Sequence, residues 1–173
     1  MKKPVLIITA LLTFCLFVKT SFAQTTTPPA TVVDAAQSSE RGGVAAFLIK
    51  VANLQDALGA AGPFTVFAPT NDAFAKLSTA KLDSLVSDPA KLATLLKAHT
   101  VVGKFAKDDI VKALNASKDR KVEFKTLDGG TLTLSYTGKL ILTDDKGNKA
   151  DVLLYNLQAG NGVVHGLSDV LLK

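Results

Sequence analysis

The sequence predicts an α+β fold with an antiparallel or mixed β core, and three observations support this prediction. Apolar residues recur at helical spacing through much of the first half of the chain. Within that half, residues 64–68 form a short β-branched and aromatic segment between two prolines, which is typical of a buried strand. Beyond Arg120 the apolar period changes to two, as in strands. A helical half followed by a strand-rich half favours helices packed on a β core.

Capping residues indicate where the helices begin. Residues 44–58 carry an apolar stripe at helical spacing and should be helical. Thr70 is expected to cap a short helix that follows the buried strand. Asp88 precedes a proline and is expected to cap a longer helix, because proline suits the first helical position. Asp108 is expected to cap another short helix.

The second half of the chain predicts a series of strands. Residues 122–126 and 132–136 alternate apolar and polar side chains on either side of an Asp-Gly-Gly turn, which indicates a hairpin. Further apolar runs follow at residues 140–142, 152–157 and 163–172, separated by glycine-containing turns. These runs supply the remaining strands of the expected core.

The N-terminus predicts export from the cytoplasm. Two lysines precede an apolar run at residues 5–18, and the small residues Ser21 and Ala23 then suit a signal peptidase. The run is shorter than the roughly 20 residues of a membrane span. We therefore expect a signal peptide over residues 1–23 and a flexible, proline-rich leader over residues 24–30; an uncleaved anchor helix is the alternative. The product would be periplasmic, on the cell surface or extracellular, with no membrane span in its mature form.

Removal of the expected signal peptide changes the composition of the chain. Of 173 residues, 150 remain, and we expect residues 31–173 to form one domain. Three lysines are lost, so the net charge falls from +5 to +2, with 17 basic and 15 acidic residues left. This near-neutral charge argues against a nucleic-acid partner. Cys15 is also lost, so the mature chain has no cysteine for a disulfide.

Three segments together indicate a family. They are GPFTVFAPTNDAF at residues 62–74, LLKAHTVVG at residues 95–103 and NGVVHGLSDVLL at residues 161–172. In this order and at these distances they resemble the first conserved box, the Tyr-His segment and the second conserved box of the fasciclin (FAS1) domain. The resemblance covers about residues 31–173. The sequence departs from the family pattern at Ala98, where the family usually has tyrosine before the histidine.

The resemblance implies a fold and a function. The implied fold is a wedge-shaped β-sandwich core with several helices, most of them from the N-terminal half. The implied function is a secreted or cell-surface module that mediates adhesion by binding an extracellular protein or polysaccharide, with no cofactor. Any contact assigned to the family's tyrosine is lost at Ala98. The alternative is a carrier that holds a small apolar ligand in a crevice of the domain.

The side chains that could carry chemistry are few. The mature chain has no cysteine nucleophile, no glycine-rich phosphate loop and two histidines, so we expect no enzyme and no catalytic residues. His99 and His165 lie on apolar stripes and are expected to be structural, because their spacing matches no local zinc signature. The polar residues Asn71, Asp72 and Asp169 of the two boxes are the candidate partner-binding residues. Helix capping and a strand-end hydrogen bond are the alternative roles for these three residues.

Two groups of charged residues are expected to have no specific ligand. An acidic loop contains Asp144, Asp145, Asn148 and Asp151. It lacks the ligand order of an EF-hand, so a solvated turn is expected and no metal is predicted. A basic group contains Lys104, Lys107, Lys118, Arg120 and Lys121. It lacks the interleaved aromatic residues of a nucleic-acid platform and would form at most a weak patch for anions.

Overall fold

The computed structural model describes residues 29–60 and 62–172, so the predicted signal peptide lies outside the described residues. The helices within these ranges are α1 (Val32–Ser38), α2 (Gly43–Val51), α3 (Gln55–Gly59), α4 (Asn71–Ala75), α5 (Thr79–Val86), α6 (Pro89–Ala98) and α7 (Lys107–Ala116). The strands are β1 (Phe64–Pro69), β2 (Thr100–Val102), β3 (Lys121–Lys125), β4 (Thr131–Tyr136), β5 (Leu140–Thr143), β6 (Lys149–Ala159) and β7 (Gly162–Leu167). None of the helices in the described part of the chain is both long enough and apolar enough to cross a membrane.

The strands form one mixed sheet in the order β2-β1-β7-β6-β5-β4-β3. β1 pairs with β7 in parallel, and the other neighbours pair antiparallel. The two edge strands approach each other, because Val101 forms a bridge with Thr126 and the Leu127 N–H donates to the Thr100 carbonyl at 2.8 Å. The sheet is therefore nearly closed. An α+β fold is confirmed, whereas the sandwich form implied by the resemblance is not.

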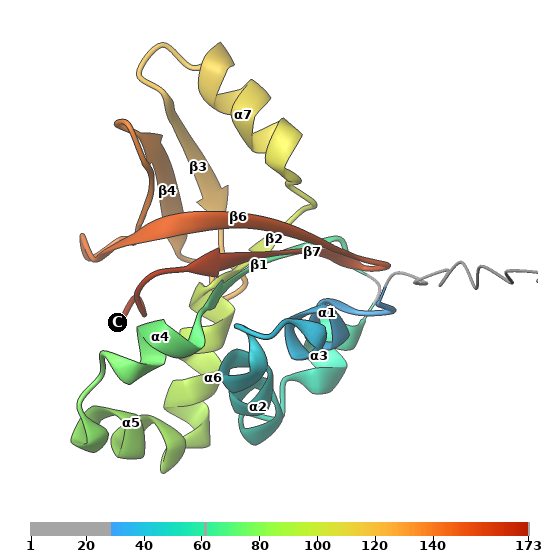
Figure 1. Cartoon of the computed structure of the whole chain (residues 1–173), viewed down its shortest axis with the longest axis vertical. Helices are drawn as coiled ribbons and strands as arrows, with labels where there is room; N and C mark the ends of the chain where they lie inside the picture. Colours follow the sequence, from blue (N-terminus) through green and yellow to red (C-terminus); the bar gives the residue numbers. More distant parts are fainter. Residues whose placement is uncertain (1–28, 61, 173) are drawn as a thin grey trace, which may run out of the picture.

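Two hydrophobic cores lie on opposite sides of β1 and β7. Helices α1 to α6 gather on one side of these strands, and α7 lies on the other side beside β3 (Figure 1). Val66 and Ala68 of β1 belong to the core under the first group of helices, whereas Phe67 belongs to the core under α7. Since both faces of β1 are covered, the strand is a continuous apolar run and not an alternating one.

The caps predicted at Thr70 and Asp88 are confirmed. The Thr70 side chain accepts a hydrogen bond from the Ala73 N–H, and the Asp88 carboxylate accepts from the N–H groups at the start of α6. The cap predicted at Asp108 is wrong, because the cap position is Ala106, two residues earlier, and the Asp109 carboxylate accepts from the Ala106 N–H at 3.2 Å. Asp108 and Asp109 both offer a carboxylate near a helix start, and spacing alone does not distinguish them.

The predicted hairpin is confirmed, since Phe124 of β3 lies opposite Leu132 of β4 in antiparallel register. Three elements have no counterpart in the sequence prediction: α1, α5 and β2. α5 has no buried residue, so its apolar pattern is weak, and β2 has only three residues. α1 is marked by a capping box in which Thr31 and Asp34 bond each other's backbone N–H groups.

Candidate functional site

The two box segments of the sequence lie side by side. β1 and β7 run parallel from the pair Phe64 and Gly162 to the pair Pro69 and Leu167. Just beyond the last pair, the Thr70 N–H donates to the Leu167 carbonyl at 3.1 Å. The chain therefore leaves both strands at the same end of the sheet. This end carries Asn71 and Asp72 after β1 and Asp169 after β7.

Asn71 connects α4 to the turn before α2. Its side-chain oxygen accepts from the Val44 N–H at 3.0 Å, and its side-chain N–H donates to the Glu40 carbonyl at 3.2 Å. Its backbone N–H also donates to the Arg41 carbonyl at 3.0 Å. Asn71 thus supplies the start of α2 with a hydrogen-bond acceptor that Gly42, at the cap position, lacks.

Asp72 differs from its neighbour because its side chain is exposed. Within the described residues, its carboxylate accepts no hydrogen bond and forms no ion pair. The group lies close enough to Arg41 to contribute to the raised pKa of that guanidinium, after the larger effect of Tyr155. Among the three candidate residues, Asp72 has the carboxylate that a partner could reach directly.

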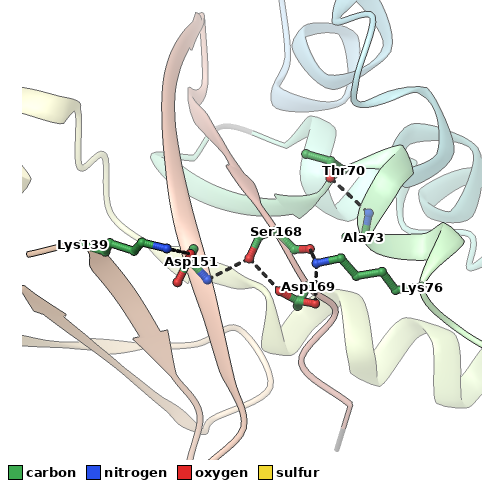
Figure 2. Close-up of polar contacts among 7 residues, drawn as sticks. All are labelled: Thr70, Ala73, Lys76, Lys139, Asp151, Ser168 and Asp169. Atoms are coloured by element: carbon green, nitrogen blue, oxygen red, sulfur yellow. Dashed lines mark hydrogen bonds and ion pairs between the residues drawn. The ribbon is translucent and has the colours of Figure 1, made fainter. Parts of the chain in front are cut away.

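Asp169 is bound by neighbouring side chains, as Figure 2 shows. Its carboxylate accepts from the Lys76 ammonium at 2.8 Å and from the Ser168 hydroxyl at 2.7 Å. Lys76 also donates to the Ser168 carbonyl at 2.8 Å, which fixes the end of α4 against the chain beyond β7. These bonds, that from Lys76 first, lower the pKa of Asp169 below its ordinary value.

The same network continues to the neighbouring strand. The Ser168 hydroxyl accepts from the Asp151 N–H at 2.9 Å, and the Asp151 carboxylate forms an ion pair with Lys139 at 3.2 Å (Figure 2). Sequence reasoning did not identify Lys76 or Ser168 as partners of Asp169. No local signal marks Lys76, because it is 93 residues away from Asp169 in the chain.

His99 is buried and joins α6 to the C-terminal segment. Its Nδ1 lies 2.8 Å from the Leu95 carbonyl, and its Nε2 accepts from the Leu171 N–H at 3.2 Å. Because Nε2 is an acceptor, the proton must be on Nδ1, which donates to Leu95. The imidazole is therefore neutral in this arrangement.

His165 is buried on the other side of β1, where its ring lies 5.8 Å from that of Phe67. Its Nδ1 faces the Asn156 N–H at 3.4 Å, and its Nε2 donates to the Phe105 carbonyl at 2.9 Å. Burial lowers the pKa of His165, and the bond to Phe105 opposes this shift only in part. The two histidines do not share a site, since β1 and its two cores separate their contacts.

Comparison with known proteins decides the family. The profile of the family described as "Fasciclin domain" matches residues 43–173. The chain belongs to the fasciclin domain family. Protein sll1483 of Synechocystis sp. is 37% identical over 145 residues, which cover 82% of this chain and 73% of that protein. The transforming growth factor-beta-induced protein ig-h3 of Sus scrofa is 34% identical over 146 residues, which cover 84% of this chain and 20% of that protein.

The fold of this fasciclin domain is also found in a solved structure. The structure of a FAS1 domain pair from the insect cell adhesion molecule Fasciclin I matches with a TM-score of 0.65 and 20% sequence identity. The match covers 84% of this chain and 52% of that one. At the position where the family usually has tyrosine, the fasciclin domain described here has Ala98, which is buried at the end of α6.

In the acidic loop of the fasciclin domain, the carboxylates of Asp144 and Asp151 bind other groups of the domain. The Asp144 carboxylate accepts from the N–H groups of Lys146 and Asn148 and from the Asn148 side chain at 2.7 Å. The Asp151 carboxylate is in the ion pair with Lys139. Within the part of the chain that the structure describes, no group of three or more His, Cys, Asp or Glu residues is arranged to hold a metal ion.

The basic group of the fasciclin domain is divided in two by α7. Lys104 and Lys107 lie at the start of this helix, whereas Lys118, Arg120 and Lys121 follow its end. A helix of 10 residues is about 15 Å long, so the two parts do not form one patch. Sequence spacing did not reveal this division because the residues are close in the chain.

Proposed function

We propose that this fasciclin domain is an adhesion module, secreted or held at the cell surface, that binds an extracellular protein or polysaccharide. The observation that carries the proposal is the shared fold with a domain pair of an insect cell adhesion molecule, over 84% of the chain. The expected signal peptide at residues 1–23 supports the extracellular location. One such domain is expected to bind weakly, and several copies on one surface would gain avidity.

The burial and contacts of the two histidines support binding more than catalysis. Both histidines are buried, and each has both ring nitrogens next to backbone groups of the domain. A general base must reach the substrate proton, and neither imidazole reaches the surface. We therefore propose that the domain is not an enzyme.

We include Asn71, Asp72 and Asp169 in the same proposal, but they do not all have the same role in partner binding. Asn71 and Asp169 bond neighbouring segments, so a partner would have to compete with the contacts of the domain itself. Asp72 is exposed and needs no such exchange. We assign the direct contact to Asp72 and a positioning effect to the other two residues.

The alternative function, a carrier for a small apolar ligand, needs an internal crevice. The gap that the core side chains leave between β1 and helices α2, α3 and α6 is about 10 Å³. Ligand pockets are roughly 300–1,000 Å³. Packing between these layers therefore favours the adhesion module over a carrier that uses this crevice.

An adhesion assay tests the proposal. Beads coated with the purified protein should adhere to a film of extracellular material from the cells that produce it, and soluble protein should compete in a saturable way. Beads coated with the Asp72→Asn variant should adhere less if Asp72 contacts the partner, while Asp83→Asn, an exposed carboxylate in α5, serves as the matched control. Equal adhesion of uncoated and coated beads would overturn the proposed function.

A further inference from the structure

An open hollow lies where α7 ends above the sheet. It has a volume of about 300 Å³ and is lined by Val111, Leu114, Asn115, Arg120, Tyr136 and Leu140. Tyr136 and Leu140 are register partners at the ends of β4 and β5. The neighbouring register pair, Leu134 and Leu142, is fully buried in the core under α7. Tyr136 and Leu140 are only partly covered, and the hollow lies between them and α7.

The floor and walls of the hollow combine apolar and planar polar groups. Tyr136 and Val111 are 43% and 42% exposed, although both are large and hydrophobic. The Arg120 guanidinium carbon lies 5.7 Å from the centre of the Tyr136 ring. Asn115 is exposed on the last turn of α7, and its side chain forms no hydrogen bond within the described residues. These groups offer a flat apolar surface beside unused polar donors.

Arg120 is held at the hollow by its backbone. Its φ of 52° is in the left-handed region, which is uncommon for a residue other than glycine. The Arg120 carbonyl accepts from the Tyr136 N–H at 3.2 Å, so the backbones of the two residues are fixed beside each other. The neighbouring Asp119 carboxylate accepts a hydrogen bond from the Ser117 hydroxyl at 2.6 Å. Within the described residues, Arg120 forms no ion pair.

The segments around the hollow have an excess of positive charge. Residues 111–121 and 136–140 contain five basic side chains and one acidic side chain, Asp119. All five basic side chains are exposed: Lys112, Lys118, Arg120, Lys121 and Lys139. Lys139 is paired with Asp151, so four remain to attract an anion.

We infer that the hollow binds an acidic polysaccharide through one uronate residue. The C–H face of the sugar ring lies on Tyr136, and its carboxylate accepts two parallel hydrogen bonds from the Arg120 guanidinium. Asn115 and the last carbonyl groups of α7 bond the sugar hydroxyls. The surrounding lysines attract the neighbouring uronates of the chain. This inference rests on the proposed function and adds a second contact surface to it, on the α7 side of the sheet and away from α4, which carries Asp72.

Calorimetry and NMR of the purified protein test the inference. The probes are short oligomers of galacturonate, of alginate uronates and of hyaluronan, together with methyl-esterified galacturonate oligomers that keep the sugar and lose the charge. At least one acid oligomer should bind and shift the amide signals of residues 111–121 and 136–140. The esterified oligomer should bind at least about 10-fold more weakly, as expected for loss of a charge-assisted bond.

Variants connect the binding to the hollow. Arg120→Asn removes the cation but suits the left-handed backbone, and Tyr136→Thr removes the ring but suits a strand. Each should weaken binding by about 10-fold or more, whereas Lys104→Gln, with the same charge loss at the other end of α7, should change it less than about twofold. Thermal unfolding of each variant shows that the fold is kept.

Several outcomes would overturn the inference: no binding of any acid oligomer, equal binding of the esterified oligomer, or an equal effect of Lys104→Gln. Tighter binding of single-stranded DNA of the same charge, with the same amide shifts, would also overturn it. The bead assay separates this inference from the proposed function. If wild-type and Arg120→Asn beads adhere equally, the uronate site is wrong while the proposed adhesion function is kept. If wild-type beads do not adhere, the proposed adhesion function is wrong.

Discussion

The side-chain oxygen of Asn161 accepts a hydrogen bond from the backbone N–H of Val32 at 2.8 Å, across 129 positions of the chain. The side-chain N–H groups of Asn161 donate to the Leu58 carbonyl at 2.7 Å and to the Ala60 carbonyl at 2.9 Å. One residue of the β6–β7 turn therefore joins the start of α1 and the end of α3 to the sheet. Such a residue stabilises contacts between elements that are far apart in sequence.

Replacing Asn161 with alanine should lower the free energy of unfolding by about 2–4 kcal/mol, because three hydrogen bonds of roughly 1 kcal/mol each are lost and partly buried backbone groups lose their partners. Urea unfolding measures the change. Asn115→Ala is the matched control, since that side chain bonds nothing within the described residues, and it should change stability by less than about 0.5 kcal/mol. Equal effects of the two substitutions would contradict the role of Asn161.

His99→Leu tests the connection between α6 and the C-terminal segment. Leucine keeps an apolar side chain at the site but leaves the Leu171 N–H without its acceptor, so stability should fall by about 1–3 kcal/mol. Amide exchange by NMR should also show faster exchange at Leu171 than the global loss of stability explains.

Leu96→Ala is the control for this experiment, because Leu96 is a buried neighbour in the same helix with no bond from its side chain to Leu171. It should lower global stability while Leu171 exchange follows the global change. If His99→Leu behaves in the same way as Leu96→Ala, the hydrogen bond contributes nothing specific.

Local signals explain why much of the fold was predictable. Thr70 and Asp88 act within their own helix turns, and the alternation around Phe124 reflects one covered face of a hairpin. These features depend on residues a few positions away, so they can be predicted from the local sequence. By contrast, the single nearly closed sheet depends on the contact of Val101 with Thr126, which no local pattern specifies.

The candidate site was less predictable because its contacts are long-range. The sequence indicated Asn71 and Asp169 as notable polar residues, but not that Asn71 bonds the turn before α2 or that Asp169 pairs with Lys76. The hollow beside Tyr136 was also missed. The alternation of β4 placed this residue with the buried Leu132 and Leu134, whereas in the structure it is 43% exposed.

His165 should make stability depend on pH near neutrality. Its pKa in the folded domain is lowered from an ordinary value of about 6.5, so between these two values the unfolded chain binds more protons than the folded domain. The free energy of unfolding should therefore be at its full value above about pH 6.5 and should fall as the pH is lowered below it. Urea unfolding at several pH values between 5 and 8 measures the slope.

His165→Gln is the matching variant, since glutamine does not titrate and keeps an N–H that can point toward the Phe105 carbonyl. Its stability should be lower at pH 8 but should change less between pH 6.5 and 5. An unchanged slope in this variant would assign the pH dependence to other groups.

The ion pair of Asp169 with Lys76 should contribute little to stability, and this separates structural from partner-binding roles. The two side chains are 44% and 56% exposed, so a double-mutant cycle with Asp169→Asn and Lys76→Gln should give a coupling of about 0.2–1 kcal/mol, reduced at high salt. Since the pKa of Asp169 is lowered, this contribution should be present above about pH 4 and be lost as the pH falls further.

The bead assay applied to the same two variants decides the function of the carboxylate. Because we assign Asp169 a positioning effect, Asp169→Asn and Lys76→Gln should both reduce adhesion, since each weakens the attachment of α4 to the chain beyond β7. Reduced adhesion of Asp169→Asn together with preserved or increased adhesion of Lys76→Gln would show instead that the partner binds the carboxylate itself. The small stability effect makes this comparison clean, since neither variant should unfold the domain.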